Sequence, residues 1–152
     1  MNFNLAKKID TADINKEFAV KDCTERILWA YETFKERLFL TTSGGETSAV
    51  LPNLTRDALG FCPSILFVDT GYLNDCTHNM IRYLENEGYD VKIYRSTISK
   101  NEIEKKFPNW DVPESVYFHD VVSMIKHEPL MRGFRELNVK AWLGGIMRYE
   151  TE

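Results

Sequence analysis

The sequence predicts an α/β fold: a doubly wound, mostly parallel sheet with helices on both faces. Two observations lead to this prediction. Short apolar runs of strand length alternate with segments whose apolar residues recur at helical spacing, which is the order of βαβ units. The most apolar run, residues 64–70, is continuous, as expected for a parallel strand that is buried on both faces.

The expected elements follow from the same patterns. A first helix should begin near Thr24, with Asp22 or Thr24 as its N-cap residue. Further helices are expected directly after residue 48, at 75–87 with Gly88 as C-cap, at 116–126 and at 129–137. Strands are expected at residues 37–42, 64–70, 90–95 and 139–146. Residues 96–115 are expected to be a loop or partly helical. Pro52 is awkward for the second helix, because a proline beyond the first turn removes a backbone hydrogen bond.

Length and composition indicate one domain preceded by an arm. The chain has 152 residues, 43% hydrophobic and 28% charged, which is typical of one globular domain. Residues 1–20 are polar and only lightly patterned, so we expect an arm at residues 1–20 and a single domain at residues 21–152. The net charge of −4 argues against non-specific nucleic-acid binding, which needs a basic face. The N-terminus does not resemble a secretory signal, and no run approaches the roughly 20 apolar residues of a membrane span. We therefore expect a cytoplasmic protein without membrane contact.

The cysteines indicate free thiols. Cys23, Cys62 and Cys76 are far apart, and no Cys-x-x-Cys pair occurs among them. This spacing predicts neither a zinc site nor a disulfide framework. We expect no bound metal.

A loop rich in glycine and hydroxyl side chains follows the first predicted strand. Paired glycines let the backbone approach an anion closely, and the helix that follows offers unpaired N–H groups. The candidate anion-binding residues are Ser43, Gly44, Gly45, Glu46, Thr47 and Ser48. The loop matches neither the Walker A nor the dinucleotide pattern, and a loop that only turns the chain and caps a helix would have the same composition.

Two more polar segments are expected at the same edge of the sheet. Asp69, Thr70, Gly71 and Tyr72 directly follow the most apolar strand, so a carboxylate, a hydroxyl and a ring arrive at its end. Near the C-terminus, a Lys-His-Glu-Pro-Leu segment begins at Lys126, and Gly145 and Arg148 lie at the end of the last predicted strand.

Together these segments resemble the phosphoadenylyl-sulfate (PAPS) and adenylyl-sulfate reductases, which belong to the adenine nucleotide α-hydrolase-like, pyrophosphate-loop superfamily. The loop at 43–48 is similar to the pattern Ser-Gly-Gly-x-Asp-Ser, with Thr47 in place of Asp. The Asp-Thr-Gly-Tyr and Lys-x-Glu-Pro-Leu segments resemble reductase motifs, and Met147 replaces the first arginine of an expected pair. The resemblance implies that all these candidate residues bind an adenine nucleotide: PAPS, adenosine bisphosphate or ATP.

The resemblance also bears on catalysis. Reductases of this kind use a thiolate in a C-terminal tail, and no such tail follows here, so we expect no sulfate reduction by this chain alone and a thiol donor or partner chain instead. Cys76 is the candidate for a catalytic thiol within the chain, because it should open a helix, where a thiol is more easily ionised. The tandem cysteines of an iron–sulfur cluster are absent. An uncovered sheet edge leads us to expect a homodimer.

Two other functions stay open from the sequence. One is a pyrophosphate-loop ATP pyrophosphatase or adenylating enzyme, which the Ser-Gly-Gly loop favours and Thr47 disfavours. The other is a catalytically silent binding or assembly protein that kept the fold and lost the reaction.

Overall fold

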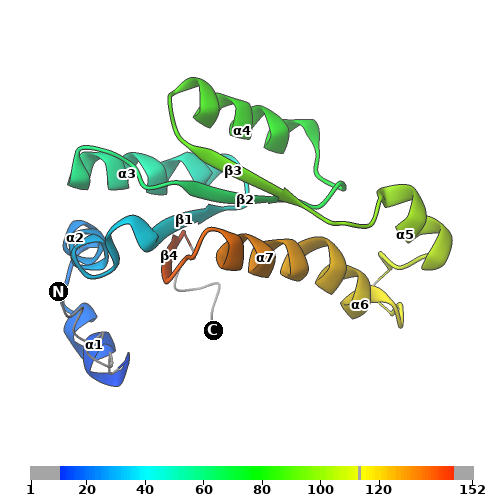
Figure 1. The fold of residues 1–152 in the computed structure, drawn as a ribbon, viewed down its shortest axis with the longest axis horizontal. Helices are drawn as coiled ribbons and strands as arrows, with labels where there is room; N and C mark the ends of the chain where they lie inside the picture. Colours follow the sequence, from blue (N-terminus) through cyan, green and yellow to red (C-terminus); the bar gives the residue numbers. More distant parts are fainter. Residues whose placement is uncertain (1–10, 113, 146–152) are drawn as a thin grey trace.

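The computed structural model describes residues 11–112 and 114–145, and it contains a four-stranded, all-parallel sheet (Figure 1). The strands are β1 (Leu38–Thr42), β2 (Ile65–Asp69), β3 (Val91–Arg95) and β4 (Ala141–Gly144). Their order across the sheet is β3-β2-β1-β4. The chain therefore moves outward from β1 to β3 and then returns to the other side of β1, which places the switch in strand order between β1 and β4.

Seven α-helices accompany the described strands. They are α1 (Thr11–Phe18), α2 (Cys23–Phe34), α3 (Val50–Leu59), α4 (Asp75–Asn86), α5 (Lys100–Lys106), α6 (Phe118–Val122) and α7 (Glu128–Glu136). Three shorter turns are η1 (Lys35–Arg37) and η2 (Glu46–Ala49), both 3₁₀, and η3 (Ser123–His127), a π-helix. None of the described helices is long and apolar enough to cross a membrane.

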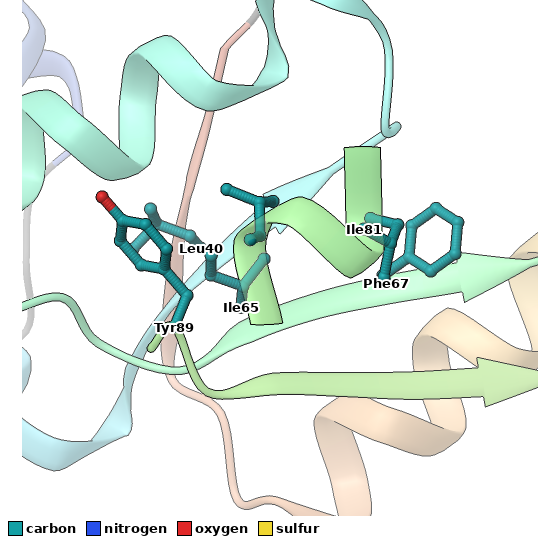
Figure 2. Close-up of a cluster of buried hydrophobic side chains, with 6 residues drawn as sticks. Leu40, Ile65, Phe67, Ile81 and Tyr89 are labelled. Carbon is teal, nitrogen blue, oxygen red and sulfur yellow. The ribbon is translucent and has the colours of Figure 1, made fainter. Parts of the chain in front are cut away.

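Helices cover both faces of the sheet, which confirms the predicted doubly wound architecture. In Figure 1, α3 and α4 lie above the sheet and α7 lies below it. The upper layer is the main hydrophobic core, in which side chains of β1 and β2 pack against α4 and Tyr89 (Figure 2). Its buried members are Leu40, Ile65, Phe67, Ile81, Leu84 and Tyr89.

The lower layer depends on a glycine that the sequence patterns did not single out. Gly133 of α7 is buried against β2 and β3. A Cβ at this position would lie 2.6 Å from Leu66 Cδ1 and 3.1 Å from Tyr94 Cδ2. The absence of a side chain therefore lets α7 approach the sheet closely enough to bury Leu66.

Helix ends match the local sequence signals. Asp22 is the N-cap residue of α2, where it forms a capping box with Glu25. Asn74 accepts a hydrogen bond of 2.9 Å from the Thr77 N–H and so begins α4. Gly88 has φ of +84° just after α4, as a C-terminal cap requires.

Two segments outside the βα units also contain helix, one where an arm was expected and one where partial helix was among the expectations. The helix α1 lies within the expected N-terminal arm, and its end contacts α2, because Phe18 packs edge-on against Trp29 with ring centroids 5.0 Å apart. Residues 96–115 contain α5, which begins with a capping box between Ser99 and Glu102. Residues 1–10 of the expected arm lie outside the described part of the chain.

Both prolines that interrupt helical patterns are accommodated. Pro52 is not the obstacle that we expected, because α3 begins at Val50 and Pro52 therefore lies in its first turn, where N–H groups have no helical acceptor. The two helices expected at 116–126 and 129–137 are joined through η3. There the Glu128 N–H bonds to the Ser123 carbonyl, five residues back, and this wide turn precedes Pro129, which has no N–H to donate.

Candidate functional site

The glycine-rich loop lies at the carboxyl end of β1, beside the switch in strand order. A small pocket of about 70 Å³ opens there. It is lined by Thr41, Thr42, Ser43, Thr47, Ser48, Leu51 and Gly145. The structure thus brings the loop together with Gly145, although about 100 residues separate them in the chain. Parallel sheets place their ligand sites at this kind of crevice.

Gly44 and Gly45 serve this loop in different ways. Gly44 is buried with φ of +72°, and a Cβ there would lie 2.6 Å from Thr77 Cγ2. Its N–H donates to Thr42 Oγ1 at 3.1 Å, so Gly44 shapes the loop against α4. Gly45 is exposed, and a Cβ would make only ordinary contacts, 3.6 Å from Ser43 Oγ and 3.9 Å from Ser48 Oγ. Gly45 therefore leaves the space next to these two hydroxyls free of a side chain.

The start of η2 completes the loop. Gly45 is the N-cap residue of η2, and no side chain of the described residues forms a capping hydrogen bond there. Ser43 Oγ and Ser48 Oγ lie 3.4 Å apart. Backbone N–H groups at a helical start together with hydroxyl donors can bind an oxyanion. Only the backbone of Glu46 is described, so its side chain has no assigned place here.

Asp69 lies at the end of β2, where both of its carboxylate oxygens have partners. Oδ1 accepts from the Gly71 N–H at 3.0 Å and lies 3.5 Å from His78 Nε2, while Oδ2 accepts from Arg95 Nε at 2.9 Å. Burial raises the pKa of Asp69, but these hydrogen bonds and the charge of Arg95 outweigh burial, so its pKa lies below the usual value. Asp69 is therefore a carboxylate at neutral pH.

Arg95 and Arg132 connect the ends of β2 and β3 to α7, and the sequence reasoning did not select either as a site residue. Arg132 Nη2 donates to the Arg95 carbonyl at 2.5 Å, and Arg132 Nε donates to Glu128 Oε1 at 2.9 Å. Arg95 is the last residue of β3, so its position at a strand end was the signal that could have found it.

Thr70, Gly71 and Tyr72 form the turn after β2. Thr70 Oγ1 accepts from the Tyr72 N–H at 3.3 Å, and Gly71 has φ of +78°. The Tyr72 ring turns away toward α5 and α6, where it packs edge-on against Trp110 at 5.0 Å and below Lys100 Nζ at 4.7 Å. Burial raises the pKa of Tyr72, and its hydroxyl has no hydrogen-bond partner within the described structure.

The other predicted residues are placed separately. Lys126 is exposed on η3, which packs against α6, α7 and β2. Arg148 lies outside the described residues. A second cavity, of about 290 Å³, lies between the segment after β3 and the α6–η3 helix. It is lined by Ser96, Thr97, Ile98, Asp120, Ser123, Met124 and Glu128.

The three thiols differ in their surroundings. Cys76 is exposed as the second residue of α4, at the carboxyl edge of the sheet, and Cys23 is exposed at the start of α2. Cys62 precedes β2 at the opposite edge, where burial raises its pKa to about 11 despite the charge of Arg56. Across residues 11–112 and 114–145, no group of three or more His, Cys, Asp and Glu side chains is arranged to hold a metal ion.

Comparison with known proteins finds relatives of this chain. The phosphoadenosine 5′-phosphosulfate reductase of a Synechococcus species is 33% identical over 141 residues, which cover 91% of this chain and 60% of that protein. The reductase of Vibrio vulnificus is 30% identical over 149 residues, covering 96% of this chain and 57% of that protein. The chain thus spans somewhat more than half the length of these relatives.

A solved structure has the same fold. It is a crystal structure of phosphoadenylyl-sulfate reductase from Candida auris in a phosphate complex, with a TM-score of 0.76 and 23% sequence identity. The similarity covers 93% of this chain and 70% of that one. In sequence, residues 37–152 match the model of the phosphoadenosine phosphosulfate reductase domain. The chain therefore belongs to the phosphoadenosine phosphosulfate reductase domain family.

Proposed function

We propose that this chain binds a phosphorylated adenine nucleotide of the phosphoadenylyl-sulfate type at the carboxyl edge of its sheet. The observation that carries the proposal is the hydroxyl-lined pocket between β1 and β4, which combines the glycine-rich loop with Gly145 at the switch in strand order. Membership of the reductase domain family supports the choice of nucleotide.

We further propose that the reducing thiol comes from another molecule. Reduction needs a thiolate that attacks the sulfur of the bound sulfate. Cys62 is a poor source of this thiolate, because it is half-buried and its pKa is raised to about 11. Cys76 is the one thiol of the three at the start of a helix on the carboxyl edge. If Cys76 supplies the thiolate instead, a Cys76→Ser variant will lose any reductase activity that the wild type shows without an added thiol donor.

The binding proposal is tested by calorimetric titration with adenosine 3′,5′-bisphosphate, phosphoadenylyl sulfate and ATP–magnesium. We expect the bisphosphate and phosphoadenylyl sulfate to bind, and a Gly45→Val variant to weaken both by about tenfold or more, because its side chain covers the hydroxyls of Ser43 and Ser48. The matched control is Gly88→Ala, at the opposite edge with open space around it, which should bind normally.

Other outcomes would replace the proposal. A preference for ATP–magnesium with release of pyrophosphate would identify an ATP pyrophosphatase. No binding of any of the three nucleotides by the wild type would identify a silent binding or assembly protein.

We also propose that the protein forms a homodimer. β4 is an edge strand of the described sheet, and Trp142 is 54% exposed on it. Light scattering at tens of micromolar protein should then give twice the monomer mass, and a monomer mass would contradict the proposal.

A further inference from the structure

Arg95 presents unused hydrogen-bond donors at the carboxyl edge of the sheet. Its side chain is 64% exposed, whereas the side chain of its partner Asp69 is 9% exposed. Only Nε is bound, to Asp69 Oδ2 at 2.9 Å. Neither Nη atom bonds to any residue that the structure describes. The guanidinium is thus held through Nε, while its two Nη atoms remain available on an exposed side chain.

Asp69 holds this guanidinium in one orientation. The carboxylate is buried and ionised, and its other oxygen is shared by the Gly71 N–H and His78 Nε2. Both oxygens are therefore used within the protein, so Asp69 is suited to positioning cationic groups and not to contacting an anionic ligand.

The backbone of Arg95 is held as well. Its carbonyl accepts from Arg132 Nη2 at 2.5 Å, and Arg132 is itself bound to Glu128. The Arg132 guanidinium also lies over the Tyr94 ring, 5.4 Å from its centroid. The Arg132 side chain is only 27% exposed, and its Nε and Nη2 donate within the fold. Arg132 is therefore less available to a ligand than Arg95, whose two Nη atoms are free of partners among the described residues.

We propose that Arg95 is a ligand-binding residue whose two Nη groups bind a phosphate or sulfate oxyanion of the nucleotide, and that Asp69 is its positioning residue. A planar guanidinium with a fixed stem presents paired N–H donors that match the geometry of such an oxyanion. Because Asp69 already orders the Arg95 side chain, less side-chain entropy is lost when the ligand binds. The inference rests on the proposed nucleotide binding and deepens it, because it assigns the anion receptor at the β2–β3 side of the edge.

The test compares two ligands across matched variants. Adenosine 3′,5′-bisphosphate and adenosine are titrated into wild type, Arg95→Met, Arg95→Lys and the control Arg135→Met. Arg135 lies in the last turn of α7, at the opposite edge, so its variant loses the same charge away from the site. We expect Arg95→Met to weaken bisphosphate binding by about tenfold or more and Arg95→Lys by less, with adenosine binding equal to that of Arg135→Met. The urea midpoint of Arg95→Met should fall, because the substitution removes the ion-pair partner of Asp69, and urea unfolding of each variant checks that the titrated protein is folded.

A second variant tests the positioning role. Asp69→Asn should weaken bisphosphate binding while Arg95 is present and have no further effect in the Arg95→Met background, because the two residues act through one another. Additive effects of the two substitutions would overturn the positioning role.

The remaining outcomes are also decisive. If Arg95→Met binds the bisphosphate like wild type while Gly45→Val does not, the inference on Arg95 is wrong and the proposed function stands. Equal losses for adenosine and the bisphosphate would also overturn the inference, because they would indicate a general distortion. If wild type binds no nucleotide, both the proposed function and the inference fail.

Discussion

The two edges of one sheet carry aspartates in opposite circumstances. At the carboxyl edge, Asp69 is buried, and it anchors Arg95, whose outer donors face solvent. At the amino edge, Asp90 has a 53% exposed side chain and bonds to Ser64 Oγ at 2.6 Å and Lys92 Nζ at 2.8 Å. Hydrogen bonds from Lys92 and Ser64 lower the pKa of Asp90, as its partners do for Asp69.

The two edges differ in whether hydrogen-bond donors remain without a partner. At the amino edge the exposed charges of Asp90 and Lys92 satisfy each other. At the carboxyl edge a buried carboxylate is used to orient donors that still lack a partner among the described residues. This contrast teaches that a lowered pKa does not by itself mark a site, because both aspartates have one and only Asp69 holds a guanidinium whose outer donors are exposed.

The largest expected effect on the free energy of unfolding comes from substituting glycines with positive φ at the two edges. Gly44→Ala should lower the free energy of unfolding by about 2–4 kcal/mol, because φ is +72° and the new Cβ would meet Thr77 at 2.6 Å. Gly60→Ala, at the amino edge with φ of +79° and open space, should cost only about 1 kcal/mol. Urea unfolding measures both, and equal costs would contradict the tight contact between the loop and α4.

The next effect separates the two aspartates. Asp69→Asn should lower the free energy of unfolding by about 2 kcal/mol at pH 7, because the Gly71 N–H and Arg95 Nε lose their charged hydrogen-bond acceptor. Asp90→Asn removes only an exposed pair, which is worth about 0–1 kcal/mol.

The contribution of Asp69 to the free energy of unfolding should depend on pH. Its pKa in the folded state is below the unfolded value, so its stabilisation is present above about pH 4 and is lost as pH falls through the folded pKa. The stability difference between wild type and Asp69→Asn should therefore shrink on acidification below about pH 4. A difference that stays constant down to about pH 2 would show that Asp69 stabilises the fold without its charge.

The smallest effect compares thiols at the two edges. At pH 8 we expect Cys62 to alkylate at least about tenfold more slowly than Cys76, equivalent to about 1.4 kcal/mol, because a pKa of about 11 leaves little thiolate and Cys62 is half-buried. The Cys62 rate should rise as the pH approaches 11. Mass spectrometry of timed iodoacetamide reactions measures both rates, and equal rates at pH 8 would contradict the environment assigned to Cys62.

Much of the architecture could be predicted because it depends on local patterns. Continuous apolar runs identified all four described strands to within two residues at each end, and Asp22, Gly88 and the residues around them identified helix ends. Pro52 was harder, since the position of a helical turn relative to a proline depends on where the preceding loop ends.

The site was predictable in position and less so in its contacts. The strand-end rule led to the glycine-rich loop and to Asp69, and the structure places both at one edge. The rule could not indicate that Asp69 binds Arg95, that Tyr72 turns toward Trp110, or that Arg95 projects outward. These outcomes depend on side-chain directions at neighbouring strands.

The sequence by itself determined the alternation of strands and helices, the glycine-rich loop and the order of the polar segments, because hydrophobic periodicity and backbone preferences act over a few residues. Only the tertiary structure decided that β4 returns beside β1 and brings Gly145 to the loop, that Gly133 lets α7 bury Leu66, and that Arg132 and Asp69 hold Arg95. Each of these depends on contacts between residues distant in the chain, whose geometry exists only once the sheet and its two helical layers have packed.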